Sequence, residues 1–437
     1  MRNRFRLMIW KLILLCGWIF QVEMLHSQAA VEIKFWHAMS GNRLRAVATL
    51  VQGFNHAHPG TKLVAQFTGS YAETMTKAIS ATRAGNPPHI IQVFEVGTQT
   101  MLDSRAFIPV FKLMQPGDID WNDLLDPIRR HYSVKGKLYS MPFNCSTSIL
   151  YYNKDLFRQA GLEPANPPAT YAELEAAGAK IVASGAAPNA LSFGWPAWVF
   201  EQTYSVNNQF YSDHANGRDG RATRLFIDNA FGVNVLQTWV DWSHEKILIY
   251  GGREYSANKA FLSGQVAMLI QSTSSVASIE SAAKFEVGTA FFPRLAGYER
   301  GNSVIGGATL WVMKGMSDQQ KEAVRKFLVW IRRTDVTKKW HQETGYFPLT
   351  KTAVAELKKE GWFDVHPNHY TALTQILSGR NTLPAHGVML GNFVQIRDIV
   401  GSALEKAFAG AVTPKAALSQ AAKEANRVLE EYNQLFR

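Results

Sequence analysis

The sequence predicts an α/β protein made of two units, the first of them built on a parallel sheet. Three observations support this prediction. Strand-like and helix-like segments alternate from residue 31 to residue 94. A second series of strand and helix patterns begins near Leu150. The stretch 143–154 joins the two series, because a run of small polar residues passes there directly into an apolar, strand-like run.

The first unit opens with alternating apolar and charged residues, a pattern typical of a strand. Its predicted elements are strands at 31–36, 62–67 and 90–94 and helices at 44–54 and 73–84. Strands that are linked by helices form parallel sheets, and such sheets bind ligands at the carboxyl ends of their strands. Tyr71 and Glu95 lie just past two of those ends.

The later part of the chain contains clear helix and strand signals. Two capping-box patterns, at 170–173 and 317–320, each predict the start of a helix. Residues 305–313 predict a strand with two glycines near its start, and Thr413-Pro414 begins the last helix. No low-complexity linker separates the two units, so we expect the chain to cross between them more than once.

Length and composition bound the classes of function. The chain has 437 residues, of which 46% are hydrophobic, enough to build a large core. The formal net charge is +11. The basic residues are scattered rather than gathered into a dense tract, so the charge favours attraction of small anions over nucleic-acid binding.

Residues 1–29 are predicted to be a secretory signal peptide. Basic residues open it, an apolar stretch follows at 12–20, and 27–29 provide small residues for cleavage. The apolar stretch is short for a membrane span, and Leu15 before Cys16 does not suit a lipid anchor. Cys145 is then the sole cysteine of the exported chain. We interpret it as a small, buried residue rather than a nucleophile.

Several enzyme signatures are missing from the sequence. It contains no G-x-S-x-G, H-E-x-x-H or phosphate-binding G-x-x-x-x-G-K-[ST] motif. His56 and His58 are close together, but their spacing in a helix-ending loop does not favour a metal site. We therefore predict no metal, no cofactor and no catalysis. A carboxylate pair assembled from distant positions, as in glycosidases, stays open at this point.

Three features suit an anionic ligand. Arg397 is a lone cation in a mostly apolar helical run, Gly306-Gly307 lets a ligand approach the backbone, and hydroxyl groups cluster at 272–275. Each feature also has a purely structural interpretation: a solvated arginine, a β-bulge and a turn.

Taken together, several motifs give the chain a family resemblance. They are Phe35-Trp36-His37, Gly85-Asn86-Pro87-Pro88, Phe94-Glu95-Val96-Gly97-Thr98, Pro142-Phe143-Asn144, Tyr151-Tyr152-Asn153-Lys154-Asp155, Ile305-Gly306-Gly307-Ala308, Leu310-Trp311-Val312-Met313, Trp340-His341-Gln342, Thr344-Gly345-Tyr346 and Val394-Gln395-Ile396-Arg397. From about Val31 to the C-terminus, the chain resembles the extracellular solute-binding proteins (family 1). Within them it is most similar to the periplasmic sn-glycerol-3-phosphate-binding proteins of bacterial ABC uptake systems.

The resemblance implies a two-lobed periplasmic-binding-protein fold of the maltose-binding-protein-like type II, with a ligand cleft between the lobes. The N-terminal lobe would comprise residues 30–145 plus about 306–348. The C-terminal lobe would comprise 146–305 plus about 349–437.

The resemblance also implies a set of ligand-binding positions. They are Tyr71, Glu95, Ser146, Trp195, Trp198, Ser272, Gly307, Tyr346 and Arg397. Arg397, the Gly307 N–H and the hydroxyl groups would donate to phosphate oxygens, whereas Glu95 would accept from glycerol hydroxyls. Tyr71 and a Trp ring would cover the carbon skeleton. Phe94 and Cys145 depart from the family pattern, which has Tyr and Ser at these positions.

The expected function is that of a non-enzymatic, monomeric solute-binding subunit in the periplasm. It would capture sn-glycerol 3-phosphate and glycerophosphodiesters such as glycerophosphocholine by hinge closure. It would deliver them to the transmembrane subunits of an ABC permease and, through them, to an ATPase. The alternatives are an oligosaccharide-binding protein of the same fold, with Trp195 and Trp198 stacking on sugar rings, and an exported hydrolase.

Overall fold

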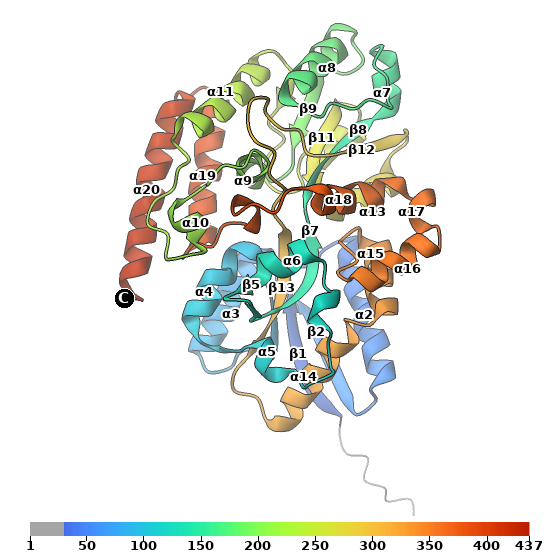
Figure 1. The fold of residues 1–437 in the computed structure, drawn as a ribbon, viewed down its shortest axis with the longest axis vertical. Coiled ribbons are helices and arrows are strands. Elements are labelled where there is room, and N and C mark those ends of the chain that lie inside the picture. The colour runs from blue at the N-terminus through green and yellow to red at the C-terminus, as the bar shows by residue number, and fades with distance from the viewer. Residues whose placement is uncertain (1–29, 437) are drawn as a thin grey trace, which may run out of the picture.

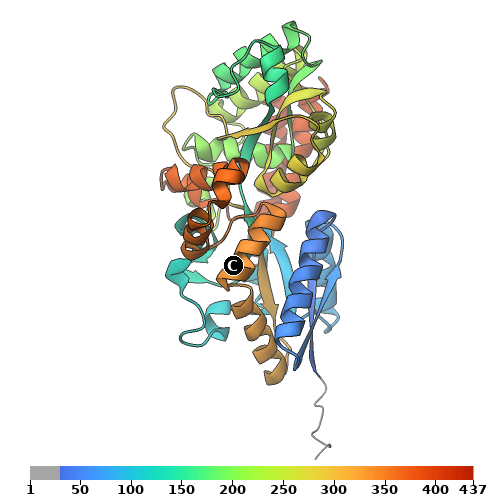
Figure 2. The same cartoon turned by 90° about the vertical axis from the view of Figure 1, so that its right-hand side faces the viewer.

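The computed structural model describes residues 30–436, which form two lobes, each with its own central sheet. Figures 1 and 2 show the lobes one above the other along the long axis of the molecule. The predicted signal peptide at 1–29 lies outside the described residues. Within 30–436, no helix has the length and apolar character needed to cross a membrane.

The sheet of the lower lobe in Figure 1 has six strands in the order β2-β1-β3-β13-β4, with β7 also paired to β13. Its strands are β1 (Val31–His37), β2 (Thr61–Phe67), β3 (Ile90–Phe94), β4 (Phe107–Ile108), β7 (Met141–Ser146) and β13 (Gly306–Met313). Strands β1, β2 and β3 are parallel, which confirms the predicted parallel sheet. Strand β13 is antiparallel to β3, β4 and β7, so a distant segment completes this lobe.

Helices cover this sheet because its strands carry apolar residues that must be buried. The helices are α2 (Asn42–Ala57), α3 (Tyr71–Arg83), α4 (Thr98–Ser104), α5 (Val110–Leu113), α6 (Asp126–Tyr132), α14 (Asp318–Trp330) and α15 (Thr334–Thr344). In β1, Ile33 and Phe35 are fully buried while Glu32 and Lys34 are not, as the alternating pattern predicted. Phe327 of α14 packs against Phe35 in the same apolar cluster.

The second sheet has five strands in the order β10-β9-β11-β8-β12. The strands are β8 (Ser148–Asn153), β9 (Asn189–Phe193), β10 (Leu248–Ile249), β11 (Val266–Ser272) and β12 (Val287–Ala290). Its surrounding helices are α7 (Lys154–Gln159), α8 (Tyr171–Ala183), α9 (Pro196–Val206), α10 (Asp213–Gly217), α11 (Ala230–His244), α12 (Asn258–Leu262), α13 (Val276–Ala282), α19 (Phe393–Phe408) and α20 (Pro414–Gln434). The predicted capping boxes are present at the starts of α8 and α14. Helix α20 begins at the predicted Thr413-Pro414 signal.

The chain passes between the two sheets more than once. A single residue, Thr147, separates the end of β7 from the start of β8. The chain leaves the second sheet after β12 and rejoins the first at β13. Helices α16 (Lys351–Lys359), α17 (Trp362–Val365) and α18 (Pro367–Ser378) lie at the level between the lobes in Figure 1. The boundaries that we gave for the two lobes stay predictions.

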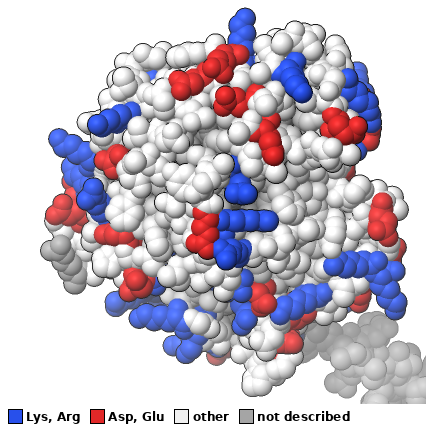
Figure 3. Space-filling model, turned by 45° about the horizontal axis from the view of Figure 1, so that its top comes forward, with Lys and Arg blue, Asp and Glu red and all other residues white. Residues whose placement is uncertain are grey.

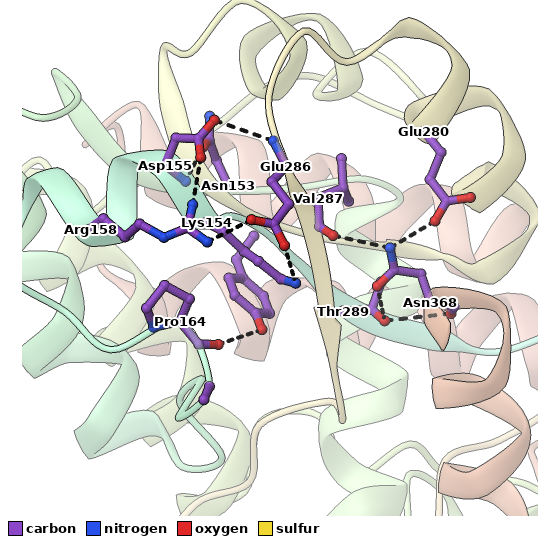
Figure 4. A network of polar contacts seen from close by, with 12 residues as sticks. Asn153, Lys154, Asp155, Arg158, Pro164, Glu280, Glu286, Val287, Thr289 and Asn368 are labelled. Atoms are coloured by element: carbon purple, nitrogen blue, oxygen red, sulfur yellow. Dashed lines mark hydrogen bonds and ion pairs between the residues drawn. The ribbon is translucent and has the colours of Figure 1, made fainter. Parts of the chain in front are cut away.

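The Tyr-Asn-Lys-Asp motif forms a polar network at the edge of the second lobe (Figure 4). Glu286, just before β12, accepts from Lys154 Nζ at 2.7 Å and from Arg158 Nη2 at 2.6 Å. Asn153 caps α7 by accepting from the backbone of Asp155 and Leu156. These side chains are largely exposed, so each ion pair contributes little by itself. The network instead holds α7 against the start of β12, so we assign it a structural role.

The free energy of unfolding should fall in mild acid because of His37. This residue ends β1, is fully buried, and its Nδ1 accepts from the Met39 N–H at 3.2 Å. Burial lowers its pKa from 6.5 to about 4. The folded state therefore binds fewer protons than the unfolded state between these values. His37 costs no stability above about pH 6.5, removes roughly 1.4 kcal/mol per pH unit as the pH falls toward 4, and adds no further loss below that.

Urea unfolding at pH 7 and pH 5 measures this effect. In His37→Asn, the Asn Oδ1 can replace Nδ1 as the acceptor and does not titrate in this range. The variant should lose less stability than the wild type between the two pH values. Equal losses in both proteins would contradict the assignment of this pH dependence to His37.

Candidate ligand-binding site

All nine predicted ligand-binding residues line one pocket between the two sheets. The residues that line this pocket are Tyr71, Phe94, Glu95, Ser146, Trp195, Trp198, Tyr255, Ser272, Ser274, Gly307, Tyr346 and Arg397. Glu95 directly follows β3, and Tyr71 begins α3, so both lie at the carboxyl-end edge of the first sheet, as expected. The second lobe contributes the start of α9, the end of β11 and one residue of α19.

Arg397 sits in a buried cluster with two carboxylates. Its Nε and Nη2 donate to the two carboxylate oxygens of Glu201, at 2.7 and 2.6 Å, and its Nη1 donates to Glu95 Oε1 at 2.8 Å. The exposed fractions are 11% for the Arg397 side chain, 11% for Glu95 and 5% for Glu201. This bidentate geometry orients the guanidinium group and leaves two of its five N–H groups for another acceptor.

The positive charge of Arg397 is already engaged by two carboxyl groups. Burial by itself lowers the pKa of Arg397, but the two carboxylates outweigh that effect and raise it, so the guanidinium stays charged. Burial raises the pKa of Glu201, while the bidentate pairing with Arg397 acts against this and requires the ionised form. The guanidinium group is thus shared between the two carboxyl groups. Because Arg397 is buried and paired, the solvated-surface interpretation of this residue is wrong.

A chain of buried amides positions the tyrosine at the start of α3. The Ala38 N–H donates to Gln92 Oε1, Gln92 Nε2 donates to Asn144 Oδ1, and Asn144 Nδ2 donates to the Tyr71 hydroxyl oxygen, each at 2.7 Å. The Tyr71 ring stacks on Phe94, with ring centroids 5.1 Å apart and 6° between the planes. Phe94, which stands where the family pattern has Tyr, thus provides the same stacking surface but has no hydroxyl group.

Hydroxyl groups of the second lobe form a connected group at the end of β11. Ser272 Oγ lies 3.0 Å from Ser274 Oγ and accepts from the Ser274 N–H at 3.2 Å. Tyr255 OH lies 3.4 Å from the same Ser274 Oγ. From the first lobe, the ring of Tyr346 lies parallel to that of Trp340, and Ser146 also lines the pocket. These hydroxyls can donate to an anion.

The two glycines of β13 have different structural causes. Gly306 leaves room for the Trp198 ring, since a Cβ there would lie 2.4 Å from Trp198 Cζ2. Gly307 has φ of +90°, and a Cβ there would lie 1.9 Å from the Asn144 carbonyl oxygen. The pairing of β13 with β7 also shifts register after Ala308, as the bulge interpretation allowed. Packing thus explains the glycine at 306, and backbone conformation explains the one at 307. In addition, Gly307 lines the pocket.

The two tryptophans occupy the start of α9. Trp195 adopts a left-handed backbone conformation, with φ of 58° and ψ of 57°, just before Pro196. A bulky residue in that region is strained, and such strain is concentrated at functional sites. The indole N–H of Trp198 is buried and has no acceptor among the described residues. Four other buried indole N–H groups of the described residues also lack an acceptor, but Trp198 lines the pocket, where a ligand can supply one.

The pocket is small and adjoins a larger one. Its free volume is about 30 Å³, and six of its lining residues also line a cavity of about 550 Å³. The larger cavity is walled by apolar and aromatic groups, such as Trp195 and Tyr250, and by charged groups of both signs. Among the charged groups, Asp398 is paired with Arg253. A ligand longer than a few atoms therefore has room to extend in this direction.

Sequence reasoning missed three polar residues of this region. Glu201 is a lone carboxylate in the apolar helix α9, and Arg397 is the one cation in the first half of α19; a lone charge in an apolar stretch is a signal for a buried partner. Arg43 lies in the first turn of α2, where the helix dipole disfavours a cation. Tyr255 had no pattern that would have identified it.

Cys145 is a packing residue in this structure. It is fully buried beside the pocket, and burial raises the pKa of its thiol to about 12. A thiol in that state is not a nucleophile at neutral pH, which agrees with the interpretation made from the sequence.

The charged residues of the surface do not form a single-sign area on the face drawn in Figure 3. Lys and Arg side chains are interspersed with Asp and Glu side chains there. This distribution agrees with the scattered charge of the sequence.

The fold and the cleft between its lobes define a binding protein, and the comparisons give its class. A family model of bacterial extracellular solute-binding proteins matches residues 49–368. The chain belongs to this family. It is 34% identical over 416 residues to the sn-glycerol-3-phosphate-binding periplasmic protein UgpB of Yersinia pseudotuberculosis, with 94% of each chain covered. It is 36% identical over 415 residues to UgpB of Escherichia coli K12, covering 93% of this chain and 94% of the relative.

Solved structures support the fold. The structure of UgpB from Mycobacterium tuberculosis in complex with glycerophosphocholine has a TM-score of 0.78 and 20% identity, covering 92% of this chain and 99% of the other. Maltose-bound MalE3 of T. maritima has a TM-score of 0.74 and 19% identity, covering 92% and 100%. The predicted two-lobed, maltose-binding-protein-like fold is confirmed.

Proposed function

We propose that this chain is the periplasmic solute-binding subunit of an ABC importer and captures sn-glycerol 3-phosphate and glycerophosphodiesters such as glycerophosphocholine. It delivers the ligand to the permease, acts as a monomer and performs no covalent chemistry; an ATPase drives the transport step. The observation that supports this proposal most strongly is the convergence of all nine predicted residues on one interlobe pocket. The curated relatives have the matching ligand in their names and cover nearly the whole chain.

The geometry divides the ligand into two ends. Glu95 and Arg397 together present both acceptors and donors, which suits glycerol hydroxyl groups. The N–H of Gly307 and the hydroxyls of Ser146 and Ser272 are neutral donors that line the same pocket, which suits phosphate oxygens. The two free N–H groups of Arg397 can still reach a ligand oxygen.

The adjoining cavity supports diesters as ligands. A phosphodiester carries a second alcohol, and the cavity of about 550 Å³ has the volume to hold it. The aromatic rings of Trp195, Tyr250 and Tyr255 on its wall suit a quaternary ammonium group such as that of choline. An oligosaccharide is not favoured: the relatives with high coverage and more than 30% identity bind sn-glycerol 3-phosphate by name, and a neutral sugar has little use for the pocket cation.

A thermal-shift and calorimetry panel tests this function. sn-Glycerol 3-phosphate and glycerophosphocholine should each raise the melting temperature and give saturable binding, whereas maltose and inorganic phosphate should not, because a ligand specific to the native state stabilises it. Ligand recovered after incubation should be intact. Binding of maltose alone would favour the oligosaccharide class, and release of free choline would favour a hydrolase.

A further inference from the structure

One cation that sequence reasoning did not assign to the site lies beside the pocket and connects the two lobes by direct contacts. Arg43 belongs to α2 of the first lobe, and its Nη1 donates to Ser274 Oγ of the second lobe at 3.3 Å. Its guanidinium carbon lies 4.4 Å from the centre of the Tyr255 ring, also in the second lobe. Both partners line the pocket.

The surroundings of Arg43 differ from those of Arg397. Within residues 30–436, no carboxylate forms an ion pair with Arg43, whereas Arg397 has two. Glu254 lines with Arg43 a cavity of about 180 Å³ beside the pocket, but the two side chains do not form an ion pair. Arg43 is half-buried, so this charge has lost part of its hydration without gaining a counter-ion.

A phosphate in the pocket needs such a charge. The guanidinium of Arg397 is already paired with the carboxyl groups of Glu201 and Glu95, so little of its charge is left to offset a bound phosphate. The hydroxyl that Arg43 contacts, on Ser274, lies 3.0 Å from the hydroxyl of Ser272, a proposed phosphate donor. Only the Ser274 hydroxyl group therefore separates Arg43 from Ser272, where the phosphate is proposed to bind.

We propose that Arg43 is a specificity-determining residue: it offsets the phosphate charge of the ligand and, by contacting the second lobe, favours the closed arrangement around an anion. This inference rests on the proposed function. Because a phosphomonoester carries close to two negative charges at pH 8 and a phosphodiester carries one, Arg43 favours sn-glycerol 3-phosphate over glycerophosphocholine.

Calorimetry at pH 8 on Arg43→Met, which removes the charge and keeps much of the side-chain length, tests the inference. The Kd for sn-glycerol 3-phosphate should rise about 10- to 100-fold, as for loss of a charge-assisted hydrogen bond, and the Kd for glycerophosphocholine should rise by a smaller factor. Arg43→Lys should recover most of the affinity for the monoester. The matched control is Arg45→Met, because Arg45 lies two residues further along α2 and is exposed; it should bind as the wild type does.

An unchanged Kd for sn-glycerol 3-phosphate in Arg43→Met would overturn the inference. Equal losses for both ligands would also overturn it, because the effect would then not follow the ligand charge. Thermal unfolding of each variant without ligand shows whether the fold is kept, and an Arg43→Lys variant that binds as poorly as a folded Arg43→Met would contradict a role for the charge. Failure of the wild type to bind either ligand would instead refute the proposed function.

Discussion

Arg397→Ala should abolish measurable binding of sn-glycerol 3-phosphate. The variant loses a donor group of the pocket and leaves Glu95 and Glu201 facing the ligand without their cation. Two buried carboxylates then repel an anionic ligand. The same change should lower the free energy of unfolding by about 3–5 kcal/mol, the usual cost of removing one partner from a buried ion pair. Calorimetry and urea unfolding measure the two effects.

Two further variants separate binding from folding. Arg158 also pairs with two acidic residues, Asp155 and Glu286, but at the exposed network of Figure 4. Arg158→Ala should keep ligand affinity and change stability by less than about 1 kcal/mol. Replacing Arg397 by Met together with Glu201→Gln should restore part of the lost stability without restoring binding. Wild-type affinity in Arg397→Ala would refute the site.

Gly307→Ala should have the second largest effect on ligand affinity and on the free energy of unfolding. Its φ of +90° is strained for alanine, and the new Cβ would meet the Asn144 carbonyl oxygen at 1.9 Å, so the backbone must move. That movement displaces the Gly307 N–H and the amide chain that positions Tyr71. We expect binding to weaken by at least 100-fold and the free energy of unfolding to fall by about 2–4 kcal/mol. Calorimetry and urea unfolding check both.

Gly264→Ala is the matched control for this change. Gly264 also has a positive φ, +73°, but a Cβ there would meet nothing within 4 Å. It should cost about 1 kcal/mol through backbone conformation alone and leave affinity unchanged. If both variants lost the same stability and both bound ligand normally, the predicted effect of the close contact with Asn144 on binding and stability would be refuted.

The elements with strong local patterns could be predicted from the sequence. The alternation in β1, the capping boxes of α8 and α14, and the Thr-Pro start of α20 depend on neighbours a few residues away, and all four are confirmed. The antiparallel placement of β13 depends on contacts with strands about 200 residues earlier in the chain, so no local pattern specifies it.

The predicted members of the site came from the family resemblance, and their convergence needed the structure. The pairing of Glu201 with Arg397 spans 196 residues, and that of Arg43 with Ser274 spans 231. The sequence around each of these residues does not show which distant residue it contacts. What such a charge faces is decided by tertiary packing, and so the charge balance of the pocket could not be worked out beforehand.

The one-residue passage from β7 to β8 makes the core of the pocket a pivot. Ser146 precedes Thr147 and is in register with Gly306, while Ser272 is in register with Ser148 on the other side. Any rotation of one lobe against the other bends the chain here as well as at its other crossings. We expect the donors beside this junction to move less than groups at the periphery of the lobes. The part of the pocket that we propose for the phosphate would then change little when the lobes close.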